Sequence, residues 1–466
     1  MKKILILCML LCPSYAFAKA EGYVSIAEEI RLYKAHVAKQ KQKQMVVSPQ
    51  INAQPESPEV DHSSSAAAVE KTIPAKVIVE DTYVEDDDTY TSAYISIAAE
   101  LRAFKEGSSY AGQKDGSGVS IVIEPEIIHE FNDGDDRITF SPFFRFDKND
   151  SDREHVDIRE FVWHHYGDGW NLNAGISKVF WGVTESNHLV DVINQTDTVE
   201  GVDGEDKLGQ PMLSLGFDKD WGNLVLYALP YFRERTFPGA EGRLRAPLPV
   251  DTDNPIYESS MKERHLDAAI RFEKVIGDWD FGISHFSGTS RDPVLKAGLD
   301  ASGNAALIPH YGLIDQTGID LQYTTDAWLW KFEGMTRGGQ GSRFSAFVGG
   351  FEYTFFDMGS TGYDVGLVAE YSRDNRGFNT PTTILDDDLF MGFRYAANNI
   401  DDTQVLAGMF VDMNTKFKVY SVESSKRFGN NWKAELEFSF YEDPTNGIEN
   451  ALASEDFMFL RIARYY

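Results

Sequence analysis

The chain is poor in cysteine, with Cys8 and Cys12 the only thiols in 466 residues. It also lacks long hydrophobic runs: residues 4–12 form the longest, and a membrane-spanning helix needs roughly 20 apolar residues. Basic residues are few, 44 Lys and Arg against 73 Asp and Glu, which gives a net charge of −29. This balance argues against binding nucleic acid or anionic phospholipid through a basic patch, so we expect no nucleic-acid partner.

The first 18 residues have the features of a secretory signal peptide. Two lysines precede the apolar run, and Ala16-Phe17-Ala18 follows it as an A-x-A cleavage site. Leucines directly before Cys12 are too bulky for a lipid-attachment site. Removal of residues 1–18 takes away both cysteines and leaves 42 basic against 73 acidic residues, a net charge of −31. We therefore expect an exported protein without disulfides or cysteine-based zinc sites.

Residues 19–92 differ in composition from the rest of the chain. They contain polar, proline-rich and serine-rich stretches, with too little apolar surface to offset the entropy of ordering. Ser25-x-x-Glu28 is a capping box that predicts a short helix, and roughly residues 37–90 predict a flexible linker. Residues 23–34 recur as residues 94–105, where Ile95, Ile97 and Leu101 alternate with other residues as in a strand. We expect residues 19–92 to be a periplasmic extension that could bind a periplasmic partner.

From residue 93 onward the hydrophobic period is two. Apolar and polar residues alternate over ten to fifteen residues at a time, for example at 266–273, 363–372 and 432–440. A soluble sandwich also alternates, but its strands average five or six residues, whereas tilted membrane strands need about ten. Tight turns alternate with long or glycine-rich loops, and these loops fall near 182–210, 237–262, 291–313, 337–342, 375–387 and 442–454. Outer-membrane barrels sort their turns in this way.

These patterns predict an all-β fold: a closed antiparallel transmembrane β-barrel over residues 93–466. Seventeen strands can be assigned from Val119 to Tyr466, and a barrel with both ends periplasmic needs an even number. Residues 93–105 supply the eighteenth, with an error of about two strands. We expect the protein in the outer membrane of a Gram-negative bacterium, among lipid and lipopolysaccharide. The C-terminal aromatic Tyr466 is like the signal read by the outer-membrane assembly machinery.

One motif goes beyond strand patterning. Trp181-Gly182 is followed by Asp191-x-x-Asn194-x-x-Asp197, and Gly288-Thr289-Ser290-Arg291-Asp292-Pro293 comes later. These motifs resemble those of a group of porin-like Gram-negative outer-membrane proteins, which are distantly similar to alginate-export channels. The resemblance covers about residues 93–300 and implies a barrel and a pore, without a named substrate.

A constriction is predicted in the long acidic loop at 182–210, which either folds into the lumen or covers its mouth. Acidic loop residues facing arginines of the next long loop would form a polar eyelet, or alternatively a salt-bridged lid. The pore-constriction candidates are Glu200, Asp203, Glu205, Asp206, Arg233, Arg235, Arg243 and Arg245.

Alternation also predicts side chains that line the lumen. Both signs of charge occur, so they either guide solutes or pair across strands and keep the lumen wet. The lumen-lining candidates are Arg145, Arg159, Asp267, Arg271, Lys331, Glu333, Glu370 and Arg394, and the same parity includes Glu124, Glu126, Asn171, Asn173, Asp320, Glu435 and Glu437.

Two rival functions remain beside passive diffusion of small polar solutes. His285-x-Ser287 resembles the catalytic pair of outer-membrane lipid hydrolases, although no acid or amide at a fitting spacing orients His285. The other rival is a non-conducting barrel that anchors a periplasmic partner. No H-E-x-x-H, G-x-S-x-G or phosphate-binding glycine loop occurs, and the EF-hand-like start at Asp147 has Asp152 where glycine is needed. We expect no enzyme activity, metal or cofactor.

Overall fold

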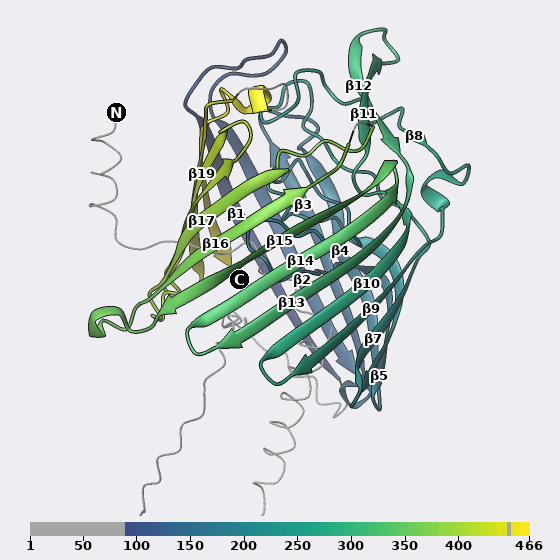
Figure 1. Ribbon diagram of the computed structural model, residues 1–466, viewed down its shortest axis with the longest axis vertical. Helices are drawn as coiled ribbons and strands as arrows, with labels where there is room; N and C mark the ends of the chain where they lie inside the picture. Colours follow the sequence, from purple (N-terminus) through teal and green to yellow (C-terminus); the bar gives the residue numbers. More distant parts are fainter. Residues whose placement is uncertain (1–88, 378, 445–448) are drawn as a thin grey trace, which may run out of the picture. The chain divides into compact units, whose positions relative to one another are not determined.

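The computed structural model describes residues 89–377, 379–444 and 449–466, and shows a closed antiparallel β-barrel of 18 strands (Figure 1). This confirms the predicted fold class and strand count. The predicted signal peptide and the extension up to residue 88 lie outside the described residues. No helix in the described part of the chain is long and apolar enough to cross a membrane.

The barrel strands follow one another in chain order. Their bounds are β1 Tyr90–Phe104, β2 Gly118–Phe131, β3 Asp136–Asp147, β4 His155–Gly167, β5 Trp170–Ser177, β6 Gln210–Lys219, β7 Gly222–Leu229, β9 Asp267–Ile276, β10 Trp279–Thr289, β13 Leu313–Thr325, β14 Trp328–Gly339, β15 Gly341–Phe355, β16 Asp364–Asp374, β17 Asp387–Ala396, β18 Gln404–Asp412, β19 Lys418–Phe428, β20 Trp432–Glu442 and β21 Phe457–Tyr465.

The first and last strands close the barrel. β1 pairs with β21 from Ser96↔Tyr465 to Phe104↔Phe457, so neither strand leaves an unpaired edge. The predicted strand at 93–105 is therefore β1, which begins three residues earlier at Tyr90. All other neighbours in the ring are antiparallel pairs that are also consecutive barrel strands.

Side chains alternate between the two faces of the wall. On β10, Phe281, Ile283 and His285 are exposed on the outside, whereas Ser284 and Phe286 are buried toward the inside. The outer surface is rich in exposed apolar side chains such as Trp163, Leu226 and Trp330. An apolar outside and a polar inside are the arrangement of a transmembrane barrel.

Turns and loops are sorted between the two ends of the barrel. Short turns join β2 to β3, β4 to β5, β6 to β7 and β9 to β10 at one edge of the barrel. The N-terminal end of β1 and the C-terminal end of β21 lie at this same edge. Long loops join β5 to β6, β7 to β9, β10 to β13 and β20 to β21. The predicted sorting of tight turns and long loops is confirmed except at 337–342, where Gln340 alone joins β14 to β15 in a tight turn.

A second, small sheet was not predicted. It lies within the long loops and contains β8 Ile256–Tyr257, β11 Val294–Leu299 and β12 Ala305–Tyr311. β11 and β12 form a hairpin beyond the barrel edge (Figure 1), and β8 pairs in parallel with β12. Short 3-10 turns complete the fold: η1 Asn132–Gly134, η2 Lys262–Arg264, η3 Met358–Ser360 and η4 Glu449–Leu452.

Candidate functional site

The loop between β5 and β6, residues 178–209, folds into the barrel and not over its mouth. Its side chains and backbone contact inward-facing residues of strands far apart around the wall. Gln316 of β13 donates its amide to the Leu189 carbonyl at 3.1 Å. A Cβ atom added to Gly318 of the same strand would lie 2.9 Å from Cγ1 of Val190. Residues 178–209 are called the inner loop below.

Two wall glutamates hold the backbone of the inner loop. The Glu333 carboxylate, fully buried on β14, accepts the N–H groups of Val183 at 2.7 Å, Thr184 at 3.0 Å and Val190 at 3.2 Å. The Glu370 carboxylate, on β16, accepts the N–H of Ser186 at 2.8 Å and that of Glu185. Charge-assisted hydrogen bonds of this kind are about twice as strong as neutral ones, and they satisfy buried carboxylates that would otherwise be costly.

The Trp181-Gly182 element packs against the Glu333 carboxylate and the barrel wall. Gly182 has φ +141°, and a Cβ atom there would lie 2.8 Å from Oε1 of Glu333, so the carboxylate has room only because the residue is glycine. Trp181 is buried, edge-on to Tyr227 of β7 at 5.6 Å between ring centroids, with the Arg271 guanidinium 5.2 Å from its ring. The element therefore docks the start of the inner loop onto the wall.

The residues of the Asp191-x-x-Asn194-x-x-Asp197 motif stabilise the fold of the inner loop. Asn194 accepts the Val179 N–H at 2.9 Å and donates to the Leu208 carbonyl at 2.9 Å, which joins the two ends of the loop. Asp191 pairs with Lys207 at 3.0 Å, and Asp197 pairs with Arg159 of β4 at 2.7 Å. Each member of Asp-x-x-Asn-x-x-Asp thus has a structural partner.

His188 links the inner loop to itself and to the wall. Its Nε2 lies 3.0 Å from Oε1 of Glu205, and its Nδ1 lies 3.9 Å from Oε1 of Glu333. Burial lowers the pKa of His188, but the close contact with Glu205 and the negative charges of both glutamates outweigh it and raise the pKa to about 10. The imidazolium form therefore stabilises the docked loop at neutral pH.

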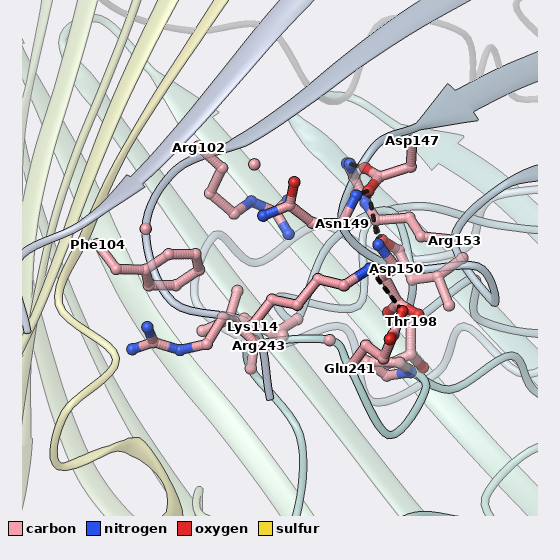
Figure 2. A pocket seen from close by; sticks show the side chains of 17 residues that line it. Arg102, Phe104, Lys114, Asp147, Asn149, Asp150, Arg153, Thr198, Glu241 and Arg243 are labelled. Carbon is pink, nitrogen blue, oxygen red and sulfur yellow. Dashed lines mark hydrogen bonds and ion pairs between the residues drawn. The ribbon is translucent and has the colours of Figure 1, made fainter. Parts of the chain in front are cut away.

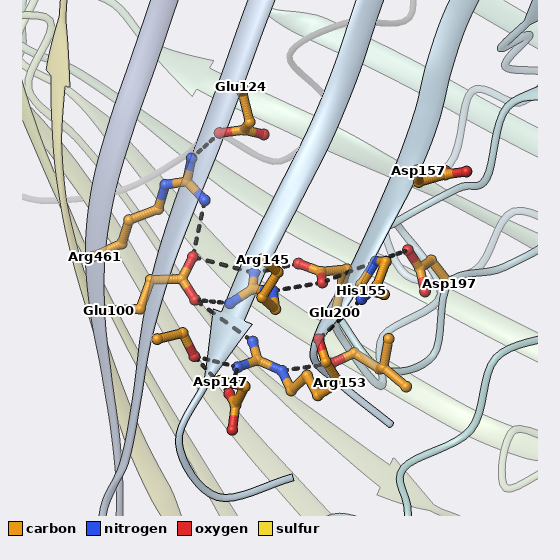
Figure 3. A network of polar contacts seen from close by, with 12 residues as sticks. Glu100, Glu124, Arg145, Asp147, Arg153, His155, Asp157, Asp197, Glu200 and Arg461 are labelled. Atoms are coloured by element: carbon orange, nitrogen blue, oxygen red, sulfur yellow. Dashed lines mark hydrogen bonds and ion pairs between the residues drawn. The ribbon is translucent and has the colours of Figure 1, made fainter. Parts of the chain in front are cut away.

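A second cluster of charges ties the far part of the inner loop to β1, β3 and β4 (Figure 3). Arg145 lies between the carboxylates of Glu100 and Glu200 and forms ion pairs with both. Arg461 of β21 continues the network, 2.9 Å from Glu100 and also paired with Glu124. Buried pairs of this kind fix geometry more than they add stability.

Three groups in this cluster have the spacing of a metal site. One ligand atom each from His155, Asp197 and Glu200 lies within 4.8 Å of the others. However, Arg159 pairs with Asp197 and Arg145 pairs with Glu200, so two cations already occupy the carboxylates. A divalent ion would have to displace both guanidinium groups, and this arrangement does not fit a metal.

The ion pairs around the predicted eyelet differ from the prediction, in which acidic residues of the loop at 182–210 face four arginines. Glu200 pairs with Arg145 on the wall and Glu205 contacts His188 within the inner loop, while Asp203 is exposed and Asp206 half-buried. The four arginines have other partners: Arg233 pairs with Asp157, Arg235 with Asp292 and Arg243 with Glu455, and Arg245 donates to backbone carbonyls of residues 111, 240, 246 and 247. None of these ion pairs joins one of the four acidic candidates to one of the four arginines, so each predicted group that is paired has its partner outside the predicted eyelet.

The predicted lumen-lining residues lie on the inward face, mostly in pairs. Arg271 forms a bidentate pair with Asp320 at 2.8 and 2.9 Å, and Asp267 pairs with Arg291 at 2.6 Å. Glu185 of the inner loop bridges Arg394 at 2.6 Å and Lys331 at 3.5 Å. The remaining candidates, Arg145, Arg159, Glu333 and Glu370, are the anchors of the inner loop described above.

A cavity of about 40 Å³ lies between the inner loop and the long-loop end of β1 (Figure 2). Arg102, Arg153 and Arg243 line it, and Lys114 pairs with Glu241 at 2.6 Å on its border. Its volume is sufficient for one or two water molecules, which is too small for a solute.

His285 and Ser287 are exposed on the outer face of β10, as their parity predicted. His285 Nδ1 contacts the Thr317 hydroxyl at 2.9 Å, and Asp315, the cross-strand neighbour of Ser287, is paired with Arg343. This cross-strand carboxylate is thus already paired with an arginine, which does not favour a catalytic triad.

Sequence reasoning missed several residues that build the site. Glu100 could have been found, because it alternates with the apolar Ala99 and Leu101 on β1. His155 and Arg153 could not, because they stand at a strand start and in a loop, where alternation carries no signal. His188 is likewise inside a loop, and only the docking of that loop gives it a role.

Comparisons with known proteins found similar chains among solved structures, each at low identity. No family model matches the chain, and no curated protein matches it. Solved structures similar to it include OmpT, an outer membrane protein of Vibrio cholerae, at 10% identity and TM-score 0.43 over 82% of this chain and 99% of that one. Acinetobacter baumannii OccAB1 has 10% identity and TM-score 0.47 over 84% and 98%. Pseudomonas aeruginosa OpdO has 10% identity and TM-score 0.47 over 81% and 96%.

Proposed function

We propose that this chain is an outer-membrane channel through which small polar solutes diffuse passively. The observation that carries the proposal is the inner loop, which is held inside a polar barrel by Glu333 and Glu370 on the wall. A lumen lined by charged side chains admits polar solutes, and a loop fixed within it narrows the passage and selects among them.

The exposed apolar outer surface supports a place in the outer membrane. We place the short-turn edge, to which both β1 and β21 lead, on the periplasmic side, because barrels of this class have short periplasmic turns. Tyr466, directly after β21, would then be available to the assembly machinery. The aromatic and apolar outer face would contact lipid and lipopolysaccharide.

Within this function, the constriction candidates divide into two roles. Asp203, Glu205 and Asp206, exposed or half-buried on the inner loop, would border the passage. Glu200, Arg243 and Arg245 are buried and would hold loops in place. Arg233 and Arg235 are half-buried and paired, which gives them a share in both roles.

The experiment is conductance of the purified, folded barrel in planar lipid bilayers. Stepwise openings with an ohmic open-channel current support the channel. A folded protein that inserts without any current contradicts it and supports the rival in which the barrel only anchors a periplasmic partner. Release of fatty acid from phospholipid that is abolished by Ser287→Ala would contradict the non-enzymatic reading.

A further inference from the structure

Arg102, near the long-loop end of β1, has few partners for an arginine. Within the part of the chain that the structure describes it forms no ion pair and donates one hydrogen bond, from Nη2 to the Glu200 carbonyl at 3.0 Å. Its Nε is buried without a partner, and its guanidinium carbon lies 5.6 Å from the ring centroids of both Phe457 and Phe459. A guanidinium has five N–H donors, so most of those of Arg102 are unused.

The charges around Arg102 offset its own charge only in part. Glu437 and Glu100 attract it, but neither forms an ion pair with it. Glu100 is already paired with Arg145 and Arg153. Both of these arginines repel Arg102. A buried cation without a close anionic partner is costly, because its lost hydration is not replaced.

The cavity of about 40 Å³ between the inner loop and β1 lies beside this guanidinium, and Arg102 and Arg153 border it from two sides (Figure 2). Arg153 is only 8% exposed, and its Nη2 has no hydrogen bond, although Glu100 lies 3.5 Å away. The hydroxyl of Thr198, on the inner loop, lines the same cavity and is also buried without a hydrogen bond. Unsatisfied buried donors around one cavity indicate a water molecule or an ion.

The charges that line the cavity favour an anion over water. The charged lining residues are Arg102, Lys114, Arg153 and Arg243 against Asp147, Asp150 and Glu241. The acidic groups are engaged elsewhere: Asp147 pairs with Arg153, Glu241 pairs with Lys114, and Asp150 accepts the backbone N–H groups of residues 152 and 239. Hydrogen bonds from a cation to an anion are about twice as strong as those between neutral groups. The volume restricts the ligand to a small ion such as chloride.

We propose that one small anion of the size of chloride binds in this cavity, held by Arg102, Arg153 and the Thr198 hydroxyl, and fixes the inner loop to the wall. The lining combines β1 and the inner loop with the loops that join β1 to β2, β3 to β4 and β7 to β9. Because the site exists only when these segments are docked, the bound anion stabilises the folded barrel by mass action. The inference concerns how the inner loop is held, and it does not depend on what passes through the lumen.

The test is the temperature at which the folded form is lost in detergent, measured at equal ionic strength in sodium chloride and in sodium gluconate, whose anion is too large for the cavity. We expect wild type to be lost about 2–4 °C higher in chloride. Arg102→Gln should show no difference between the salts, because the cation without an ion pair is removed. The matched control is Arg343→Gln, which removes a half-exposed arginine of β15 that pairs with Asp315, and it should keep the wild-type difference.

Equal temperatures in the two salts for wild type, or the same difference in wild type and in Arg102→Gln, overturn the anion site. Crystals of the wild-type protein soaked in sodium bromide give a second measurement, which also decides if Arg102→Gln does not fold. An anomalous peak between Arg102 and Arg153 supports the site, and a cavity that holds only water overturns it. Neither measurement uses a current, so the loss of the anion site leaves the proposed channel intact.

Discussion

At the scale of single residues, Glu333 is the central anchor of the inner loop. Its fully buried carboxylate accepts three backbone N–H groups and the Thr184 hydroxyl, at 2.7 to 3.2 Å. Glu333→Gln keeps the shape but replaces one accepting oxygen by a donor. We expect it to weaken docking of the loop by about 1–3 kcal/mol and to give larger, noisier single-channel currents. The control Glu273→Gln alters an inward glutamate that pairs with Arg271 and should leave the currents unchanged.

His188 gives the docked loop a pH dependence. Its pKa is raised from 6.5 to about 10 by Glu205 and Glu333, which outweigh burial. A raised pKa means that the stabilisation is complete below about pH 6.5 and is lost progressively until the pH passes about 10. We expect conductance and current noise to rise over this window in wild type and to stay level in His188→Gln. An equal rise in both proteins would assign the effect to other groups.

At the scale of elements, the position of the inner loop can be tested with a disulfide. A Cβ atom added to Gly318 of β13 would lie 3.3 Å from Cβ of Val190, close to the separation in a disulfide. In a protein without residues 1–18, Val190→Cys/Gly318→Cys has the only two thiols, and we expect them to oxidise to an intramolecular bond with little change in conductance. Val202→Cys/Gly318→Cys uses an exposed residue of the same loop as the control and should stay reduced. Free thiols in the first pair would contradict the docked loop.

Some strands of the fold could be predicted from the sequence and others could not. The barrel strands were predictable because alternation and turn signals are local, and the 93–105 segment could be assigned because closure requires an even number of strands. The small sheet of β8, β11 and β12 was not predictable, since its parallel pairing joins residues 256–257 to residues 310–311. The same limit applies to the site: parity identified Glu333 and Glu370 as inward, but their partners lie more than 140 residues away in a loop without periodicity.

At the scale of the whole molecule, the barrel closes entirely within residues 90–465. Closure satisfies the strand edges, so a chain that starts at Thr89 should fold in detergent and keep a folded form that shifts in electrophoresis on boiling. Deletion to residue 105 removes β1 and opens the ring between β2 and β21, and this protein should lose the heat-resistant form. A soluble monomer from either chain would contradict the membrane barrel.

The central claim is that a charged, water-filled passage runs beside a loop fixed inside the barrel. Single-channel recording of the purified protein in planar bilayers tests it most directly. We expect discrete open levels whose current becomes larger when the anchor is removed by Glu333→Gln. Insertion of folded protein without current, or identical currents in both proteins, would contradict it.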